Sequence, residues 1–380
     1  MTMARSARSK LRSEFNKQLN EKSRVKKVKL ESAFINLKPK LGYFNWAEFL
    51  FLIGAAQAGK SYAVIDFFVH QFLEHDTPFY WFRLTERQSA QLLNNKAEKL
   101  IDPDIRRKYN LDLVTSGTNV YNVKRAEYKI KHKDGTEEVK SRIVEKKLMA
   151  RVLALSTFYS DKGNGYFDKD YTGWINVGLD EFQPEANEKS TFDITYAFVR
   201  QMENIARNRK TKVRVIGCAN MLEEASDILC AFDFIPEEYG LYKLKKKRCV
   251  IWYIEPTNAY KEMRKGSIAN MLLPNSSMYS NEKKQDYSLV FKGRLHKPQK
   301  VIKFSKDEKT WFTLWDNGCI CQYNKEHCDV IAMRPYIDEL FNAKNRDNVF
   351  MCFDTRAYVF RNLICFKQFE KQLSLLKPRK

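Results

Sequence analysis

The chain has 380 residues, 44% of them apolar, which is enough for two domains or for one large domain with appendages. Its formal net charge of +21 is more than a soluble enzyme of small molecules normally needs, and it predicts affinity for a polyanion: a nucleic acid, an anionic membrane surface or an acidic protein. No stretch is apolar over the length that a bilayer crossing needs, so we expect no transmembrane span. Of the polyanionic partners we predict nucleic acid and no membrane.

Residues 1–40 form a basic arm, with twelve Lys or Arg residues against three acidic ones. Such a composition is typical of a solvated tail and also of a segment that contacts nucleic acid, and the sequence leaves both interpretations open. The start is rich in Arg and Ser, as in a transit peptide, but the acidic residues Glu14, Glu21 and Glu31 argue against one.

A phosphate-binding loop is predicted for residues 54–61, where two glycines five apart are followed by Lys60 and Ser61. An apolar run over 47–53 predicts a strand before the loop, and helical spacing over 62–72 predicts a helix after it. In that context the backbone N–H groups of the loop and the helix N-terminus bind phosphates. Lys60 would reach the β- and γ-phosphates, and the Ser61 hydroxyl would hold Mg²⁺.

A glycine-rich turn that caps a helix and binds nothing is the alternative to a nucleotide site. The flanking strand and helix argue against this alternative, because they supply the context that the loop pattern requires. We therefore predict a nucleotide site. Its contacts in this segment are Gly54, Ala55, Ala56, Gln57, Ala58, Gly59, Lys60, Ser61 and Tyr62.

A second strand is predicted over 79–83, followed by a helix with apolar residues at helical spacing. Residues that follow this strand lie near the nucleotide edge of a doubly wound sheet. Arg83 and Arg87 are therefore candidates to touch the base or a phosphate, although an ordinary surface arginine explains either of them equally well.

Residues 121–155 change to a two-residue alternation, and the Asp-Gly pair at 134–135 between two alternating runs is a strong hairpin signal. We expect a charged, two-stranded projection from the sheet. Its lysines Lys129, Lys131 and Lys133 are candidate contacts to nucleic acid, and a solvated hairpin face is the other explanation of this charge.

The strand predicted over 174–180 ends in Asp180, and Glu181 follows it. An apolar strand that ends in Asp-Glu fits the second motif of nucleotide hydrolases. Asp180 would steady Mg²⁺ through its coordination shell, and Glu181 would polarise the attacking water. Any buried strand can end in acids, but this pair lies 120 residues after Lys60 in a chain that alternates strands and helices, so we predict a hydrolytic site.

A helix is predicted over 190–208, and the strand predicted over 213–217 leads to Asn220. A polar residue at the tip of a strand beside the phosphate loop can hydrogen-bond the γ-phosphate or water, which is the role we predict for Asn220; a turn-forming asparagine is the alternative. The cluster of Arg200, Arg207 and Arg209, on this helix and just after it, is a candidate source of an arginine finger that acts on a neighbouring subunit's nucleotide. A basic surface favoured by the helix dipole explains them as well.

The remaining chain predicts a smaller C-terminal α/β domain. Alternation returns over 287–323, and helical patterns follow around 336–341 and over 356–376, separated by the apolar run 349–353. No strand there carries a clear inward acid, so nuclease activity is not predicted. The predicted boundaries are a basic arm at 1–40, a P-loop ATPase domain at 41–255, a helical linker subdomain at 256–286 and the C-terminal domain at 287–380.

Together the motifs resemble the genome-packaging ATPases of small podoviruses, the phi29-like group. The resemblance is carried by residues 51–63, 179–182, 206–209 and 215–220. It implies an α/β fold of the P-loop NTPase type, RecA- or ASCE-like, with a parallel sheet flanked by helices. It also implies a short helical linker and a C-terminal domain that resembles a nuclease fold without its active acids.

The resemblance further implies what the protein does and where. The chain would form a homo-oligomeric ring, a pentamer in this group, docked at the portal of an empty viral prohead in the host cell cytoplasm. It would bind ATP and Mg²⁺ and drive double-stranded DNA inward, with a structural packaging RNA as a further partner. Arg207 would act as a finger in trans, and Lys162 would be a second trans contact.

Two other functions stay open. A helicase or another P-loop ATPase acting on nucleic acid would show unwinding without capsid components. A non-enzymatic, basic nucleic-acid-binding module would use the nucleotide as a structural ligand, and the change Glu181→Gln would then leave its function intact. The Asp180-Glu181 pair argues against such a module, because the glutamate has no purpose there without hydrolysis.

Overall fold

The chain divides into two compact units, Met1–Leu222 with Glu238–Asn281 and Glu223–Glu237 with Glu282–Lys380, and each is described by itself. This division differs from the predicted boundaries, because residues 223–237 group with the second unit. The computed structural model describes residues 34–37, 46–131, 137–160, 173–183, 192–206, 212–220, 226–236, 238–268, 289–295, 298–304, 310–315, 318–324, 336–339 and 343–376.

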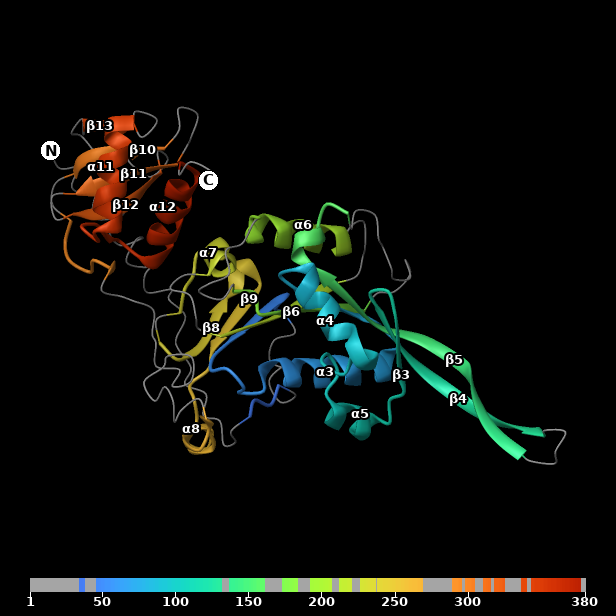
Figure 1. Ribbon diagram of the computed structural model, residues 1–380. Helices are drawn as coiled ribbons and strands as arrows, with labels where there is room; N and C mark the ends of the chain where they lie inside the picture. Colours follow the sequence, from blue (N-terminus) through green and yellow to red (C-terminus); the bar gives the residue numbers. More distant parts are fainter. Residues whose placement is uncertain are drawn as a thin grey trace. The chain divides into compact units, whose positions relative to one another are not determined.

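The first unit is built on a nine-stranded sheet (Figure 1). In spatial order its strands are β3 (Leu113–Ser116), β4 (Asn119–Lys131), β5 (Glu137–Ala154), β2 (Phe79–Arg83), β6 (Trp174–Asp180), β7 (Lys212–Ala219), β1 (Phe49–Ile53), β9 (Cys249–Tyr253) and β8 (Gly240–Leu244). The strands from β5 to β9 in this order are parallel, whereas β3, β4 and β8 add antiparallel pairs at the two edges. The predicted α/β fold is confirmed, with antiparallel strands extending the parallel sheet at both ends.

Helices cover both faces of this sheet, which is why its central strands are apolar throughout. In β1, Leu50 belongs to the same buried cluster as the apolar face of α3 (Lys60–His75). The neighbouring Phe49 instead contacts the ring of Phe198 in α6 (Ile194–Ala206). Successive side chains of a strand point to opposite faces, so α3 and α6 lie on opposite sides of the sheet, as Figure 1 shows.

The pairing of β2 with β6 depends on Gly178. A Cβ atom at this position would lie 2.2 Å from Cε3 of the buried Trp81 ring, so only glycine lets the ring pack against the neighbouring strand. Trp81 stands opposite Gly178 in the parallel register. This packing fixes the position of β6 and therefore of Asp180, its last residue.

Three further helices of the first unit are α4 (Glu86–Ala97), α5 (Pro103–Tyr109) and α8 (Asn258–Lys265). Each begins where a side-chain oxygen accepts a hydrogen bond from an N–H group of the first turn, which satisfies a donor that the helix leaves unpaired. The capping residues are Thr85, Asp102 and Thr257. Within the described ranges, no helix is both long and apolar enough to cross a membrane.

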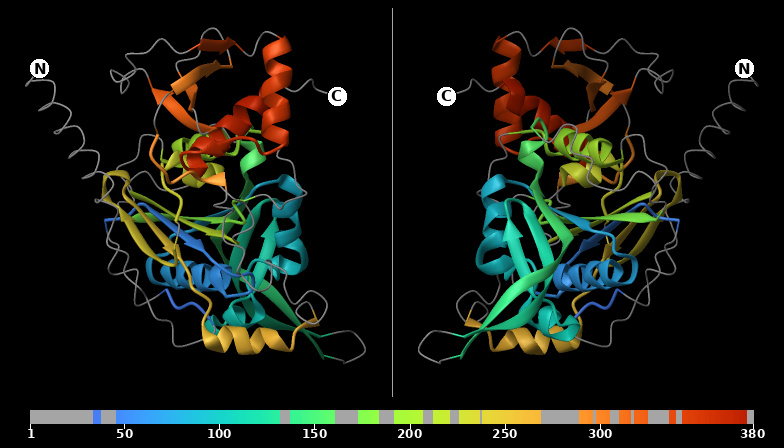
Figure 2. Two further views of the ribbon diagram at one scale, coloured as in Figure 1. Left: turned by 90° about the vertical axis from the view of Figure 1, so that its left-hand side faces the viewer. Right: turned by 90° about the vertical axis from the view of Figure 1, so that its right-hand side faces the viewer.

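Strands β4 and β5 form the long hairpin that the alternation over 121–155 predicts. Figures 1 and 2 show the two strands extending beyond the rest of the sheet. Lys129 is exposed on β4, which ends at Lys131. Lys133 and the turn predicted at 134–135 lie outside the described residues.

The second unit contains a five-stranded sheet packed against helices. In spatial order its strands are β13 (Tyr336–Glu339), β10 (Pro298–Lys303), β11 (Thr310–Trp315), β12 (Cys319–Asn324) and β14 (Val359–Phe360). Aromatic rings fill its core, where Phe369 of α12 (Leu363–Leu376) packs edge-on against Phe312. Helix α7 (Asp227–Ala231) contacts α12, which explains why residues 223–237 group with this unit.

Three predictions for the second unit are wrong. The helix predicted around 336–341 is strand β13, because residues there pair in parallel with β10. The apolar run 349–353 does not separate two helices but lies inside α11 (Ala343–Asp354), and a short apolar run has no pattern that distinguishes the two cases. The last helix begins at Leu363 rather than at residue 356, because part of the intervening segment pairs with β12 as β14.

Candidate active site

The predicted phosphate-binding loop lies between β1 and α3, at the carboxyl edge of the parallel strands. Beside it, β6 ends in Asp180, and β7, which pairs with both β1 and β6, leads to Asn220. Gly59 ends the loop with a φ of 78°, a left-handed conformation that glycine adopts without strain, and is the N-cap of α3. Three strand ends therefore meet at the loop.

Lys60 is buried at the start of α3, with 6% of its surface exposed. Its Nζ donates hydrogen bonds to the backbone oxygens of Gly54 (3.1 Å) and Ala55 (2.6 Å) and to Oδ1 of Asn220 (2.9 Å). Burial lowers the pKa of the Lys60 ammonium to about 8, although neighbouring ionisable groups oppose the shift. The structure thus brings together two residues that the sequence predicts at the γ-phosphate.

Ser61 and Asp180 are in direct contact, since Oγ of Ser61 donates a hydrogen bond of 2.7 Å to Oδ1 of Asp180. A hydroxyl and a carboxylate are the hard oxygen groups that Mg²⁺ takes from a protein when phosphates and waters complete its coordination. The two residues therefore fit the Mg²⁺ site that the sequence predicts.

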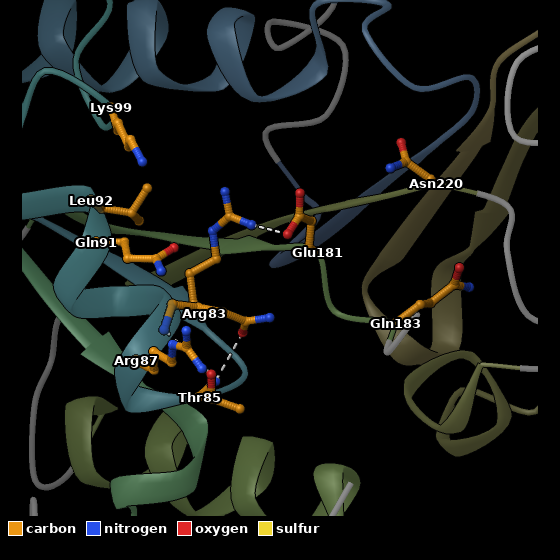
Figure 3. Close-up of a pocket in the computed structure, with 10 residues that line it drawn as sticks. Arg83, Thr85, Arg87, Gln91, Leu92, Lys99, Glu181, Gln183 and Asn220 are labelled. Carbon is orange, nitrogen blue, oxygen red and sulfur yellow. Dashed lines mark hydrogen bonds and ion pairs between the residues drawn. The ribbon is translucent and has the colours of Figure 1, made fainter. Parts of the chain in front are cut away.

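Arg83, the last residue of β2, lies against both acidic residues of the predicted hydrolytic motif. Figure 3 shows its contact with Glu181. Its Nη2 is 2.9 Å from Oδ2 of Asp180, and its Nη1 donates to Oε2 of Glu181. Glu181 follows β6 with a left-handed φ of 50°, and 51% of its side chain is exposed. The structure therefore places an arginine between the two acids. The predicted contact of Arg83 with a base or phosphate stays a prediction.

A cavity of about 200 Å³ lies over the loop and the ends of β6 and β7. Sequence reasoning missed one residue of its wall, Cys218, whose buried thiol has a pKa raised by desolvation. Cys218 could have been found by aligning the two predicted strands in parallel, because it stands opposite Asp180 in the register of β6 and β7. The predicted catalytic and metal-binding residues in the wall are Lys60, Ser61, Asp180, Glu181 and Asn220.

A second cavity, of about 600 Å³, adjoins the first, since Glu181 and Asn220 line both. Arg87 belongs to the wall of this larger cavity together with Lys99 and Gln91 (Figure 3). Sequence reasoning missed Gln91 on α4 and Lys99 just after it, because a single polar residue in such a segment carries no sequence pattern that marks a site. The predicted contact of Arg87 with the nucleotide stays a prediction.

Three predicted contacts to a neighbouring subunit lie outside the described residues: Lys162, Arg207 and Arg209. Helix α6 approaches Arg207 in sequence and ends at Ala206. The roles of these three side chains therefore stay predictions.

No protein-family model and no curated protein matches the chain. Among solved structures, the Phi-28 gp11 DNA packaging motor resembles it with a TM-score of 0.57 and 14% sequence identity, over 92% of this chain and 100% of that one. The bacteriophage Phi-29 viral genome packaging motor assembly resembles it with a TM-score of 0.54 and 19% identity, over 90% of this chain and 100% of that one. At these identities the likeness concerns the fold, and the chain has the fold of DNA packaging motors that its motifs predict.

Proposed function

We propose that this chain is the ATPase of a phage genome-packaging motor, which hydrolyses ATP and translocates double-stranded DNA into a preformed capsid. The observation that carries the proposal is the contact of Ser61 with Asp180 in a cavity that Lys60 and Glu181 also line. The fold shared with two DNA packaging motors supports it. The net charge of +21 supports a polyanionic partner.

ATP would bind with its phosphates on the loop. The loop N–H groups, the N-terminus of α3 and the Lys60 ammonium would bind the β- and γ-phosphates. Asn220 would hydrogen-bond the γ-phosphate or the attacking water from the end of β7. Ser61 and Asp180 would hold Mg²⁺, which neutralises phosphate charge when bound.

Glu181 would act as the general base. Its carboxylate would accept a proton from a water whose oxygen bonds to the γ-phosphorus, while the bond from that phosphorus to the β–γ bridging oxygen breaks and ADP leaves. In the structure this carboxylate is paired with Arg83. The proposed step needs this carboxylate to be free of the ion pair, so that it can accept a hydrogen bond from the attacking water.

The working assembly that we propose is a ring of identical subunits, a pentamer, docked at the portal of a prohead in the host cell cytoplasm. A structural packaging RNA would be a further partner. The fold shared with the two motors supports this arrangement. In such a ring the nucleotide would lie between neighbours, where Arg207, with Lys162 and Arg209, would reach it in trans.

Double-stranded DNA would be held mainly through its phosphates. The β4–β5 hairpin offers the exposed Lys129, followed along the strand by Lys131 and then Lys133. Phosphate contacts dominate the affinity of such binding but carry no base information. DNA binding by this chain should therefore weaken steeply with salt and depend little on base sequence.

The test of the proposed function is ATP hydrolysis with and without double-stranded DNA, across protein concentration. Turnover per chain should rise with DNA and with concentration. Lys60→Ala should lose nucleotide binding, whereas Glu181→Gln should bind ATP without hydrolysing it. Glu203→Gln, the same change at an exposed acid of α6, should behave as wild type.

Two results would contradict the proposal. If Glu181→Gln retains full function, the nucleotide is a structural ligand. If the isolated chain separates DNA strands without capsid components, the protein is a helicase.

A further inference from the structure

The tip of the phosphate loop is held by contacts from two distant parts of the chain. Oη of Tyr260 in α8 donates a hydrogen bond of 2.7 Å to the backbone oxygen of Ala56. The guanidinium of Arg264, one turn further along α8, donates to Oε1 of Gln57. On the next residue, the backbone oxygen of Ala58 accepts from the Ile35 N–H group at 3.3 Å. Three successive loop residues therefore each have an external partner.

The two side chains of α8 that contact the loop are buried. Tyr260 is 2% exposed and Arg264 is 9% exposed, although α8 lies more than 200 residues after the loop. Thr257 fixes the start of this helix, because its side chain accepts from the Tyr260 N–H group at 3.0 Å. The preceding Ile254 extends the sheet alongside β1, where its N–H group donates to the Ile53 oxygen at 2.7 Å.

The two bonds to backbone oxygens fix the direction of loop N–H groups. In a trans peptide the C=O and the following N–H point in opposite directions. A bond from Tyr260 to the Ala56 oxygen therefore directs the Gln57 N–H away from α8. The bond from the Ile35 N–H to the Ala58 oxygen likewise directs the Gly59 N–H away from Ile35. Gln57 and Gly59 both line the cavity over the loop, whereas Tyr260 does not.

The contact of Arg264 acts on the one strained residue of the tip. Gln57 has a φ of 61°, a left-handed conformation that is costly for a residue with a side chain. Left-handed residues in a loop turn successive N–H groups to one side and so form an anion-binding concavity. The Gln57 side chain accepts a hydrogen bond from Arg264, and this bond offsets part of the backbone strain.

We propose that Tyr260 and Arg264 are positioning residues, which hold the phosphate loop in its anion-binding conformation before the nucleotide arrives. The inference rests on the proposed function, because it assumes that the loop binds a nucleoside triphosphate. Helix α8 is then part of the nucleotide site without touching the nucleotide. Because Tyr260 and Arg264 preorganise the loop, they should raise its affinity for the phosphates of the ligand.

The test measures binding of Mg²⁺–ATP and of tripolyphosphate by calorimetry to the full chain, with Tyr260→Phe and Arg264→Met as variants. Each variant removes one hydrogen bond to the loop and should weaken both ligands by about fivefold to tenfold. The loss should be equal for the two ligands, because tripolyphosphate has no base or ribose. Lys261→Met, on the exposed side of α8, is the matched control and should bind as wild type.

A double-mutant cycle separates positioning from a loss of folded protein. Arg264→Met should weaken binding in the wild-type background much more than in a Gln57→Ala background, where the loop side chain that it bonds to is already gone. Arg264→Lys, which keeps a donor, should restore part of the affinity. The melting temperature of each variant is measured in parallel. The order of the variants by melting temperature should differ from their order by ligand affinity.

The inference is overturned if Tyr260→Phe and Arg264→Met bind both ligands as tightly as wild type, or if Arg264→Met weakens binding equally with and without Gln57. Failure of the proposed function has a different signature. In that case wild type itself binds no nucleotide, or Lys60→Ala binds it unchanged.

Discussion

Oγ of Ser61 donates a 2.7 Å hydrogen bond to Oδ1 of Asp180, across 119 residues of sequence. The contact exists because β6, which ends in Asp180, and the loop after β1 reach the same edge of a parallel sheet. It places two hard oxygen groups together beside a buried lysine. The same pair gives the first prediction.

Ser61→Ala should remove the part of nucleotide affinity that depends on Mg²⁺. The loop and Lys60 remain, so binding of ATP in EDTA should be nearly unchanged, whereas added Mg²⁺ should no longer tighten it. Titration of a fluorescent ATP analogue with and without Mg²⁺ measures the difference. Ser89→Ala is the matched control, because Ser89 is a buried serine that bonds to the Leu153 oxygen away from the site. An unchanged Mg²⁺ effect in Ser61→Ala would contradict the assignment.

Arg83→Met should destabilise the free protein. The change leaves the buried Asp180 carboxylate without its cation, and breaking such a pair costs about 2 kcal/mol where one partner is partly exposed. Denaturant unfolding in EDTA should show this loss. Addition of Mg²⁺–ATP should recover part of it, because a bound cation can replace the guanidinium.

Arg87→Met is the control for that measurement. Arg87 lines the neighbouring cavity, and its substitution removes the same charge as Arg83→Met. Among the described contacts, no ion pair joins Arg87 to Asp180. Equal losses in the two variants would mean that the Arg83 pair contributes nothing specific to stability.

The sequence predicted the parts of the site that are local. The loop at 54–61 depends on glycines and flanking apolar runs within a few residues, and Asp180 and Asn220 are each the natural end of an apolar strand. Parallel strands end at a common edge, so a correct assignment of strands also brings these residues together. Their proximity in the structure follows from that rule.

Other features depend on long-range contacts that no local pattern carries. Arg83 meets the two acids only because β2 pairs with β6. Tyr260 and Arg264 reach the loop from a helix that the sequence assigns to a linker subdomain. In the second unit, β13 is a strand because β10 supplies its hydrogen-bond partners, although the segment itself has a helical pattern.

The lowered pKa of Lys60 predicts a pH dependence of stability. The folded protein releases this proton at about pH 8, whereas the unfolded chain holds it up to the ordinary value of 10.5. Between these values the unfolded state binds more protons, so the stability contributed by Lys60 rises with pH. Relative to the non-titrating Lys60→Met, wild type should gain about 3 kcal/mol from pH 7 to pH 10.5.

Urea unfolding of the two proteins at several pH values measures this difference. Lys261→Met, at an exposed lysine of α8, controls for the loss of one positive charge. A difference between wild type and Lys60→Met that stays constant from pH 7 to pH 10.5 would show that Lys60 titrates normally in the folded protein.

Lys129→Ala combined with Lys131→Ala should weaken DNA binding uniformly across base sequences. Loss of two phosphate contacts should reduce the slope of log affinity against log salt by about two. ATP affinity without DNA should not change, because the hairpin residues do not line either cavity of the site. Lys147→Ala, at a lysine of β5 that pairs with Asp76, is the control. An unchanged salt slope would place the DNA elsewhere on the protein.

Arg207→Ala should lower ATP turnover by about 10³-fold while leaving ATP binding intact, because an arginine finger acts on the transition state. If Arg207 acts in trans, an active interface needs Lys60 from one subunit and Arg207 from its neighbour. A mixture of Arg207→Ala with Lys60→Ala should then regain activity that neither protein has alone, since some interfaces combine the two intact residues. A mixture of Arg207→Ala with the double variant Lys60→Ala/Arg207→Ala has no intact interface and should stay inactive. If the first mixture also stays inactive although the subunits assemble, Arg207 serves its own subunit, and hydrolysis does not require a neighbour.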